Sequence, residues 1–204
     1  SGAGTFNVKG AFAYSKTASA PTTDTVAFTD TSGTNLITEG NYTFYNLTVN
    51  GTGATYTLGA AITINNDMTI SNGTFDISGA NYAVTCKGNW TVGSGVFNYQ
   101  TGTVTLNKSG TSTQTISGAT FYNLTLDNTT AATTASKTLA NTCNILGSLV
   151  IGNGGAGISQ LNTGANDLYV SRSWTNNCVG GLLSTGTVAL NGASGTQTIA
   201  GSQS

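Results

Sequence analysis

The sequence predicts an all-β fold, specifically a β-solenoid in which short strands stack coil upon coil as a right-handed parallel β-helix. Three observations carry this prediction. Helix formers are scarce, with one Glu and five Lys against 39 Thr, 22 Asn and 28 Gly. Thr, Val, Ile and aromatic residues lie in short runs separated by Gly and Asn-Gly, as strands and tight turns require. Strand-like runs recur at about twenty residues, which is the length of one solenoid coil.

A longer repeat contains several of these coils. The six residues TFYNLT occur identically at 43–48 and at 120–125. Downstream, TLGAAITINNDMTI at 57–70 aligns with TLANTCNILGSLVI at 138–151, and the segment 186–199 begins a third copy. The match therefore extends well beyond the six-residue string.

This repeat sets the expected domain organisation. We expect one β-solenoid domain over residues 1–204, with two long repeats at about 25–102 and 103–186 and partial units at both ends. An antiparallel β-sandwich is the alternative, because its strands are also short and its turns are also rich in Gly.

Alternation within the repeated string predicts which side chains face the core. We expect Tyr45 and Tyr122 to face inward with the leucines that follow them, and Asn46 and Asn123 to face outward. Outward Asn-x-Thr alternation also produces N-glycosylation sequons, so their number is no evidence of glycosylation. The sequons begin at Asn41, Asn46, Asn50, Asn72, Asn89, Asn107, Asn123 and Asn128.

Composition excludes several classes of partner. Charged residues make up 6% of the chain, and six basic groups nearly balance seven acidic ones. No charged surface is expected that would attract nucleic acid or anionic lipid. No window approaches the ~18 consecutive apolar residues of a membrane-spanning helix. We therefore expect no nucleic-acid partner and no membrane span.

The three cysteines, Cys86, Cys143 and Cys178, allow one disulfide and leave one thiol over. None lies in a CxxC pair, and the chain has no His, which argues against a zinc site. We expect them to be small buried side chains, or to form one opportunistic bridge.

The residues that carry catalysis are few. Without His, a Ser-His or Cys-His nucleophile is excluded. The carboxylates are Glu39 and six Asp, among which no pair stands out. GNGGAG at 152–157 matches GxGxxG, but the segment after it lacks helical periodicity, so it is interpreted as a repeat corner. We expect no enzyme, no catalytic residue, no cofactor and no metal.

Two binding functions remain as alternatives. A carbohydrate-binding or carbohydrate-cleaving β-helix, such as a phage tail spike, would use exposed aromatics, for which Tyr99 and Tyr169 are the candidates. Trp90 and Trp174 occupy equivalent repeat positions and are expected to pack in the core or at corners. Ice binding is a minor alternative, because rows such as TVT at 103–105 do not recur in every coil.

The pattern GTVTLN…TQTISG…FYNLTLDN…LVIGNG…W resembles the Gly/Thr/Asn-rich repeat of large bacterial and archaeal surface and adhesin-like proteins. The resemblance covers nearly the whole chain, apart from an insertion-like stretch at 14–24. It implies a parallel β-helix and brings no catalytic signature. With the composition, it leads us to expect a non-enzymatic structural protein on a cell surface, an extracellular fibre or a virus particle.

The frame of the repeat suggests how such a protein assembles. GTFNVKGAF at 4–12 resembles GVFNYQTGTV at 95–104, late in the long unit, and the last copy stops where an FYNLT strand is due. We expect either a segment of a longer surface protein or a head-to-tail homopolymer; glycans are the other candidate partner. The residues expected at the self-assembly contact are Gly4, Thr5, Phe6, Asn7, Val8, Thr196, Gln197, Thr198 and Ile199.

Overall fold

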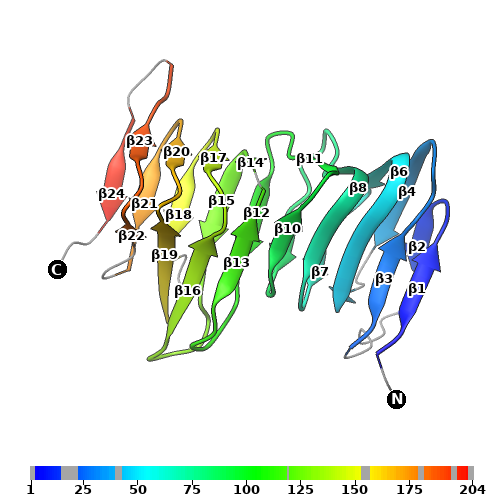
Figure 1. Cartoon of the computed structure of the whole chain (residues 1–204), viewed down its shortest axis with the longest axis horizontal. Helices are drawn as coiled ribbons and strands as arrows, with labels where there is room; N and C mark the ends of the chain where they lie inside the picture. Colours follow the sequence, from blue (N-terminus) through cyan, green and yellow to red (C-terminus); the bar gives the residue numbers. More distant parts are fainter. Residues whose placement is uncertain are drawn as a thin grey trace. The chain divides into compact units, whose positions relative to one another are not determined.

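A computed structural model describes residues 3–14, 23–39, 43–118, 120–152, 157–178, 182–193 and 197–201. In these ranges the chain is all-β without a helix, and its parallel sheets form a β-solenoid of about eight turns, about 22 residues apart (Figure 1). The predicted solenoid is confirmed. The recorded strand pairs are parallel in both halves of the chain, which excludes the antiparallel sandwich.

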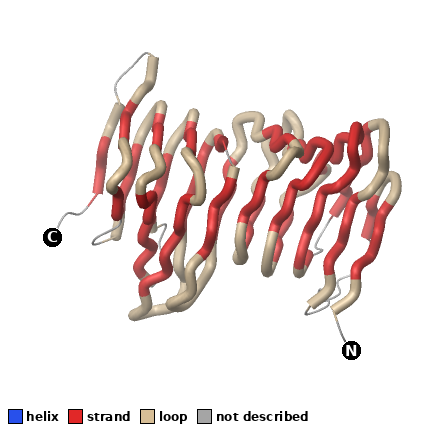
Figure 2. The backbone as a smooth tube through the Cα atoms, in the orientation of Figure 1, coloured by secondary structure: helices blue, strands red, loops and turns tan. Residues whose placement is uncertain are grey.

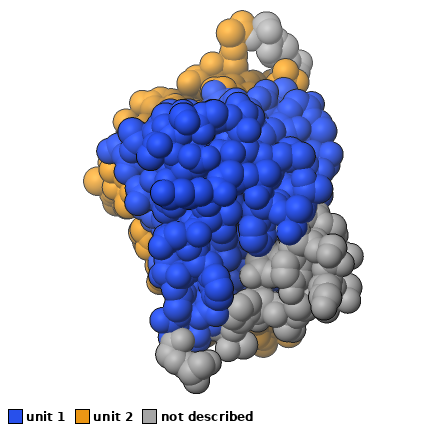
Figure 3. Space-filling view, turned by 90° about the vertical axis from the view of Figure 1, so that its right-hand side faces the viewer, with its two compact units in different colours: residues 1–102 blue, residues 103–204 orange. Residues whose placement is uncertain are grey.

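The chain divides into two compact units, Ser1–Gly102 and Thr103–Ser204 (Figure 3). This boundary lies at the junction of the two long sequence repeats, 25–102 and 103–186. Whether 1–204 behaves as one domain stays a prediction.

In unit 1, one sheet runs in the order β1-β3-β6-β8-β10, with β4 between β2 and β6 and with β11 beside β8, and a second sheet runs β5-β7-β9. The long strand β6 pairs with β3 over residues 46–49 and with β4 over residues 55–58. Likewise, β8 pairs with β10 over residues 68–70 and with β11 over residues 74–76. In Figure 2 the strands are the red stretches of the tube, joined by tan turns. The strands are β1 (Thr5–Val8), β2 (Phe12–Tyr14), β3 (Thr25–Phe28), β4 (Thr34–Glu39), β5 (Thr43–Phe44), β6 (Asn46–Leu58), β7 (Ile62–Ile64), β8 (Met68–Asp76), β9 (Val84–Cys86), β10 (Trp90–Val92) and β11 (Val96–Asn98).

In unit 2, three sheets line the coil, in the orders β13-β16-β19-β22, β12-β15-β18-β21-β24 and β14-β17-β20-β23. Neighbouring strands in each of these sheets come from successive coils. The strands are β12 (Thr103–Leu106), β13 (Gln114–Ser117), β14 (Thr120–Phe121), β15 (Asn123–Leu126), β16 (Thr134–Leu139), β17 (Cys143–Ile145), β18 (Leu149–Ile151), β19 (Ile158–Gly164), β20 (Leu168–Val170), β21 (Trp174–Asn176), β22 (Leu182–Ser184), β23 (Val188–Leu190) and β24 (Ile199–Gly201).

Parallel, in-register stacking turns strand alternation into columns of like side chains. Leu47, Met68 and Trp90 occupy successive rungs of one inward column, and all three are fully buried. Trp174 is also buried, so the prediction that both tryptophans pack in the interior is confirmed. The core therefore consists of apolar columns that run from coil to coil.

The predicted inward position of Tyr45 and Tyr122 is wrong. Each TFYNLT string contains two strands, and the chain bends at the tyrosine between them. Phe44 and Phe121, which end the first strands, are the fully buried residues, whereas both tyrosines are partly exposed. Because the chain bends at the tyrosine, the alternation of inward and outward side chains starts again after it. If the string is treated as one continuous strand, the tyrosine is placed on the inward face in error. Leu47 and its counterpart Leu124 do face inward, as predicted.

Glycine is required where coils meet most closely. Gly73 has φ 74° and sits against the carbonyl oxygen of Gly51 in the preceding coil, where any Cβ would collide. Of the positions singled out above, Asn41, Thr196, most of GNGGAG and most of the stretch 14–24 lie outside the described residues.

Candidate coil-docking site

The first candidate docking edge is β1. It pairs with β3 in register, so that Phe6 stands next to Val26 and Val8 next to Phe28 on the inward side. Val26 and Phe28 are buried, but Phe6 is 60% exposed, because β1 ends its sheet in the described part of unit 1. The core column thus continues to an open rung that presents an aromatic side chain.

Some backbone groups of β1 face away from β3, toward the side on which no described strand lies. The carbonyls of Gly4 and Val8 accept hydrogen bonds from β3, at 2.8 Å from the Thr25 amide and 2.9 Å from the Thr29 amide. Because alternate residues of a strand direct their N–H and C=O groups to opposite neighbours, those of Thr5 and Asn7 point away from β3. They form an edge able to accept another parallel strand.

The second candidate edge lies in the last coil of unit 2. β24 pairs with β21, and the Thr198 carbonyl accepts the Trp174 amide at 2.8 Å. Ile199 stands in register with buried Trp174, yet it is 67% exposed. The Gln197 side chain donates to the Val170 carbonyl at 3.0 Å, so it fastens this coil to the previous one.

The same coil contains docking residues that the sequence analysis missed. Val188 and Leu190 of β23 stand in register with Leu168 and Val170, which are fully buried. Both are themselves partly exposed. The alternation over residues 188–190 predicts that Val188 and Leu190 face inward. Only the pairing of strands between coils shows that no described strand covers them.

Asx side chains at the corners fasten each coil to its neighbour. An Asp67 oxygen accepts the Asn89 amide at 2.7 Å, and an Asn123 oxygen accepts the Ser148 amide at 3.0 Å. At the open edge, Asp24 accepts the Gly4 amide at 2.8 Å in the same way. These polar side chains therefore serve cohesion between coils.

A fully buried lysine interrupts the apolar interior of unit 2. Lys137 of β16 is fully buried, in register with Gln114 and Leu161, and its Nζ donates to the Lys108 carbonyl at 2.8 Å. Burial lowers the pKa of Lys137 to about 8, the negative charge of Asp127 opposes this shift, and the charge of Lys108 adds to it. Sequence reasoning missed this group, although the alternation of Ala135, Lys137 and Leu139 indicates its inward position.

The three cysteines are buried free thiols. Of the two alternatives expected from the sequence, small buried side chains or one disulfide, the structure therefore shows the first. Burial raises the pKa of Cys143 to about 12. The Cys86 sulfur lies 3.3 Å from the Asn66 carbonyl oxygen, and the Cys178 sulfur accepts the Ser159 amide at 3.4 Å. The structure brings no two of them together.

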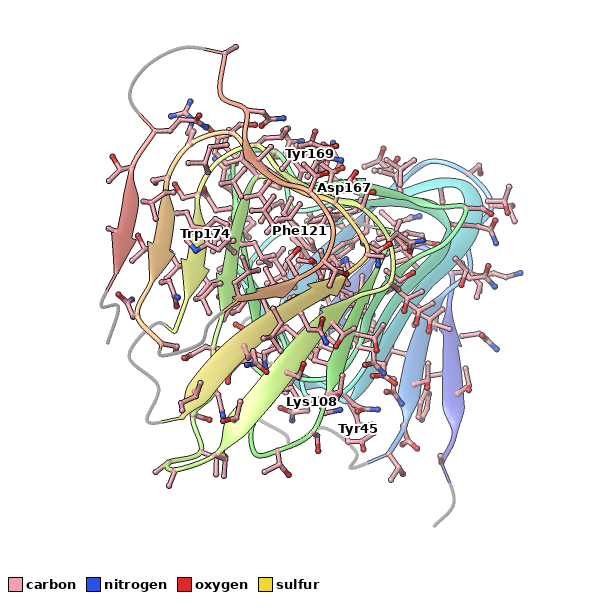
Figure 4. The ribbon with its side chains drawn as sticks, turned by 60° about the vertical axis from the view of Figure 1, so that its left-hand side comes forward. Tyr45, Lys108, Phe121, Asp167, Tyr169 and Trp174 are labelled. Carbon is pink, nitrogen blue, oxygen red and sulfur yellow. The ribbon has the colours of Figure 1, made fainter. Side chains whose placement is uncertain are left out.

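The candidate sugar-stacking residues differ in their surroundings. Tyr99 contacts the ring of buried Phe97, whereas Tyr169 lies on the outer face of β20 beside Asp167 (Figure 4). The Tyr169 hydroxyl donates to one Asp167 oxygen at 3.2 Å, and the Thr187 amide donates to the other at 2.9 Å. The bond from Thr187 is the main cause that lowers the pKa of Asp167, and the Asp167 carboxylate raises that of Tyr169.

Described aspartate carboxylates accept hydrogen bonds from backbone amides, as is seen at Asp24, Asp30, Asp67, Asp76 and Asp167. Asp76 shows their usual environment: it accepts the Ser78 amide at 2.7 Å and the side chains of Asn98 and Gln100 at 3.0 Å each. Three His, Cys, Asp or Glu side chains that could hold a metal are not found together in the described ranges. In those ranges, too, no helix has the length and apolarity of a membrane span.

No protein-family model, no curated protein and no solved structure matches this chain. The likeness to Gly/Thr/Asn-rich surface-protein repeats therefore stays a resemblance.

Proposed function

We propose that this chain is a non-enzymatic structural protein of an extracellular surface assembly, located on a cell surface, a fibre or a virus particle. Its coils add to further coils of the same kind to form a filament or a long fibre. One observation carries the proposal: the inward columns of the solenoid run to open rungs, where Phe6 and Ile199 are the most exposed large apolar residues described.

The chemistry of each edge favours another coil as its occupant. A parallel strand beside β1 would pair with the outward groups of Thr5 and Asn7 and would cover Phe6 in the same step. Complete burial of one large apolar side chain contributes about 1.5–3 kcal/mol, and backbone pairing adds direction and register. With 6% charged residues, electrostatic repulsion between stacked copies is weak.

The coil that docks on an open edge can have two origins, and both would make the same contacts. It belongs either to the same polypeptide in a longer protein or to a second copy in a head-to-tail polymer. We propose that a second copy docks in this way when the 204-residue chain is studied alone.

The test uses sedimentation velocity and negative-stain electron microscopy of the purified chain over a range of concentrations. End-to-end assemblies should grow with concentration, and Phe6→Asp or Ile199→Asp should weaken association at least tenfold. The matched control is Leu36→Asp, because Leu36 is an exposed residue of β4, a strand with a partner on each side. A monodisperse monomer at every concentration, or an equal effect of Leu36→Asp, would overturn the self-docking proposal.

A further inference from the structure

We propose that the outer face of the β14-β17-β20-β23 sheet in unit 2 binds a neutral polysaccharide, with the ring of Tyr169 as its stacking platform. This binding function is independent of coil docking, because it uses an outward face of the coils instead of their open edges.

The outward column of this sheet differs from its counterpart in unit 1. Both columns begin with the Thr of TFYNLT, Thr43 in β5 and Thr120 in β14. In unit 1 it continues with Thr63 and Thr85. In unit 2, Thr120 is followed in register by Asn144, Tyr169 and Ala189. An aromatic ring and an amide thus replace hydroxyls on successive rungs.

The hydrogen bond to Asp167 fixes how the Tyr169 ring lies. Asp167 precedes Tyr169 by two residues, so the 3.2 Å bond draws the hydroxyl along the strand direction. On one flank the next rung carries only the methyl group of Ala189. A ring held along the strand beside so small a neighbour offers its apolar face to a ligand.

The other flank supplies a polar group. Asn144 stands on the rung next to Tyr169, and within the described residues its side chain makes no hydrogen bond. Its amide can both donate and accept, as sugar hydroxyls do. Neighbouring rungs lie about 4.8 Å apart, so one pyranose ring can cover Tyr169 with its C–H face and reach Asn144 with a hydroxyl.

The charges on this face favour a neutral sugar over an acidic one. Both oxygens of the Asp167 carboxylate are engaged, by Tyr169 and by Thr187, and its charge would repel uronic or sialic acid groups. The nearby cation, Arg172, lies over the ring of Tyr122, with its guanidinium carbon 5.8 Å from the ring centroid. It is thus engaged with an aromatic ring and is poorly placed to pair with an anion.

The test is isothermal titration calorimetry of the 204-residue chain with cellohexaose, chitohexaose, mannohexaose and xylohexaose, and with hexagalacturonate as the acidic probe. At least one neutral hexasaccharide should bind, and Tyr169→Ala should weaken its binding about tenfold. Tyr169→Phe keeps the ring and should retain most of the affinity. Asn144→Ala should weaken binding by a smaller factor. The matched control, Tyr45→Ala, removes a partly exposed tyrosine from unit 1 and should leave the affinity unchanged.

Three outcomes would overturn the proposal: no neutral hexasaccharide binds, hexagalacturonate binds most tightly, or Tyr169→Ala binds like the wild type. Sedimentation of Tyr169→Ala should match the wild type, so failure of sugar binding is distinguishable from failure of coil docking.

Discussion

Phe6 stands in register with Val26 on neighbouring rungs of one inward column, yet Phe6 is 60% exposed and Val26 is 6% exposed. Among the described strands, Val26 of β3 has a neighbour on each side, β1 and β6, whereas Phe6 of β1 has only β3. The exposure of Phe6 is therefore a property of the open coil and not of the repeat. In unit 1 the same column continues from Val26 through Leu47, Met68 and Trp90, all of them apolar and buried.

Gly147→Ala should destabilise unit 2 by about 1–3 kcal/mol. A Cβ at position 147 would meet the Asn123 side-chain oxygen, and it would lie 2.8 Å from the Tyr122 carbonyl oxygen. It would displace the bond from the Ser148 amide to Asn123 that fastens two coils. Gly79→Ala is the control, because no atom lies within 4 Å of a Cβ there. Thermal unfolding of both variants measures the difference; equal midpoints would contradict the packing argument.

Lys137 should make unit 2 more stable as the pH rises above about 8. Its folded pKa of about 8 lies below its ordinary value of 10.5, so between these values the unfolded chain binds more protons than the folded one. The free energy of unfolding therefore increases with pH across this window, by up to about 3 kcal/mol. Lys137→Met removes the titrating group and keeps most of the volume.

The measurement for Lys137 is urea unfolding of the wild type and of Lys137→Met at pH 7 and at pH 10. Other lysines and tyrosines titrate in both proteins, so the informative quantity is the difference between them. The wild type should gain stability relative to Lys137→Met as the pH rises. A difference that stays constant would show that Lys137 is not held in an environment that disfavours its charge.

Asn128→Ala should cost about 2–4 kcal/mol in the free energy of unfolding. Asn128 is fully buried; its amide nitrogen donates to the Thr133 carbonyl at 3.0 Å and to the Ile158 carbonyl at 3.2 Å. Its removal leaves these partly buried backbone carbonyls without that partner. Asn50→Ala, at an exposed sequon, should cost less than about 0.5 kcal/mol. Chemical denaturation compares the two, and similar losses would contradict the burial argument.

Native thiols should not react with a disulfide reagent at pH 8. Cys86 and Cys143 are buried, and the pKa of about 12 leaves Cys143 almost entirely protonated. Three thiols should react once the chain is unfolded in urea, since all three cysteines are free. Fast reaction of the folded protein would contradict their burial. A count of one thiol after unfolding would reveal a disulfide.

Strand content, coil length and the long repeat could be predicted from the sequence, because they depend on local alternation and glycine spacing. The strand-like runs that recur at about twenty residues, however, do not all stack in one column of side chains. Ala27, Thr48 and Thr69 share a column in unit 1, whereas Tyr169 and Ala189 share another in unit 2. The sequence shows the period, but the distribution of strands among sheets depends on where each coil bends.

The candidate sites were less predictable, for the same reason. The docking residues at 4–8 follow from the repeat frame, but the exposure of Val188 and Leu190 requires knowing that no described strand covers them. Tyr169 was one of two aromatic candidates, and only the register shows Asn144 beside it. Lys137 breaks the rule that charged residues face outward, so composition gave no sign of it.

The most direct test of the coil-docking account is hydrogen exchange at the backbone amides of Thr5 and Asn7, measured by NMR at low and high concentration of the chain. These amides point away from β3, so docking of a second copy should slow their exchange as the concentration rises in the wild type. In Phe6→Asp their exchange should stay fast. Fast exchange of both amides at every concentration, in samples that sedimentation shows to be associated, would contradict it.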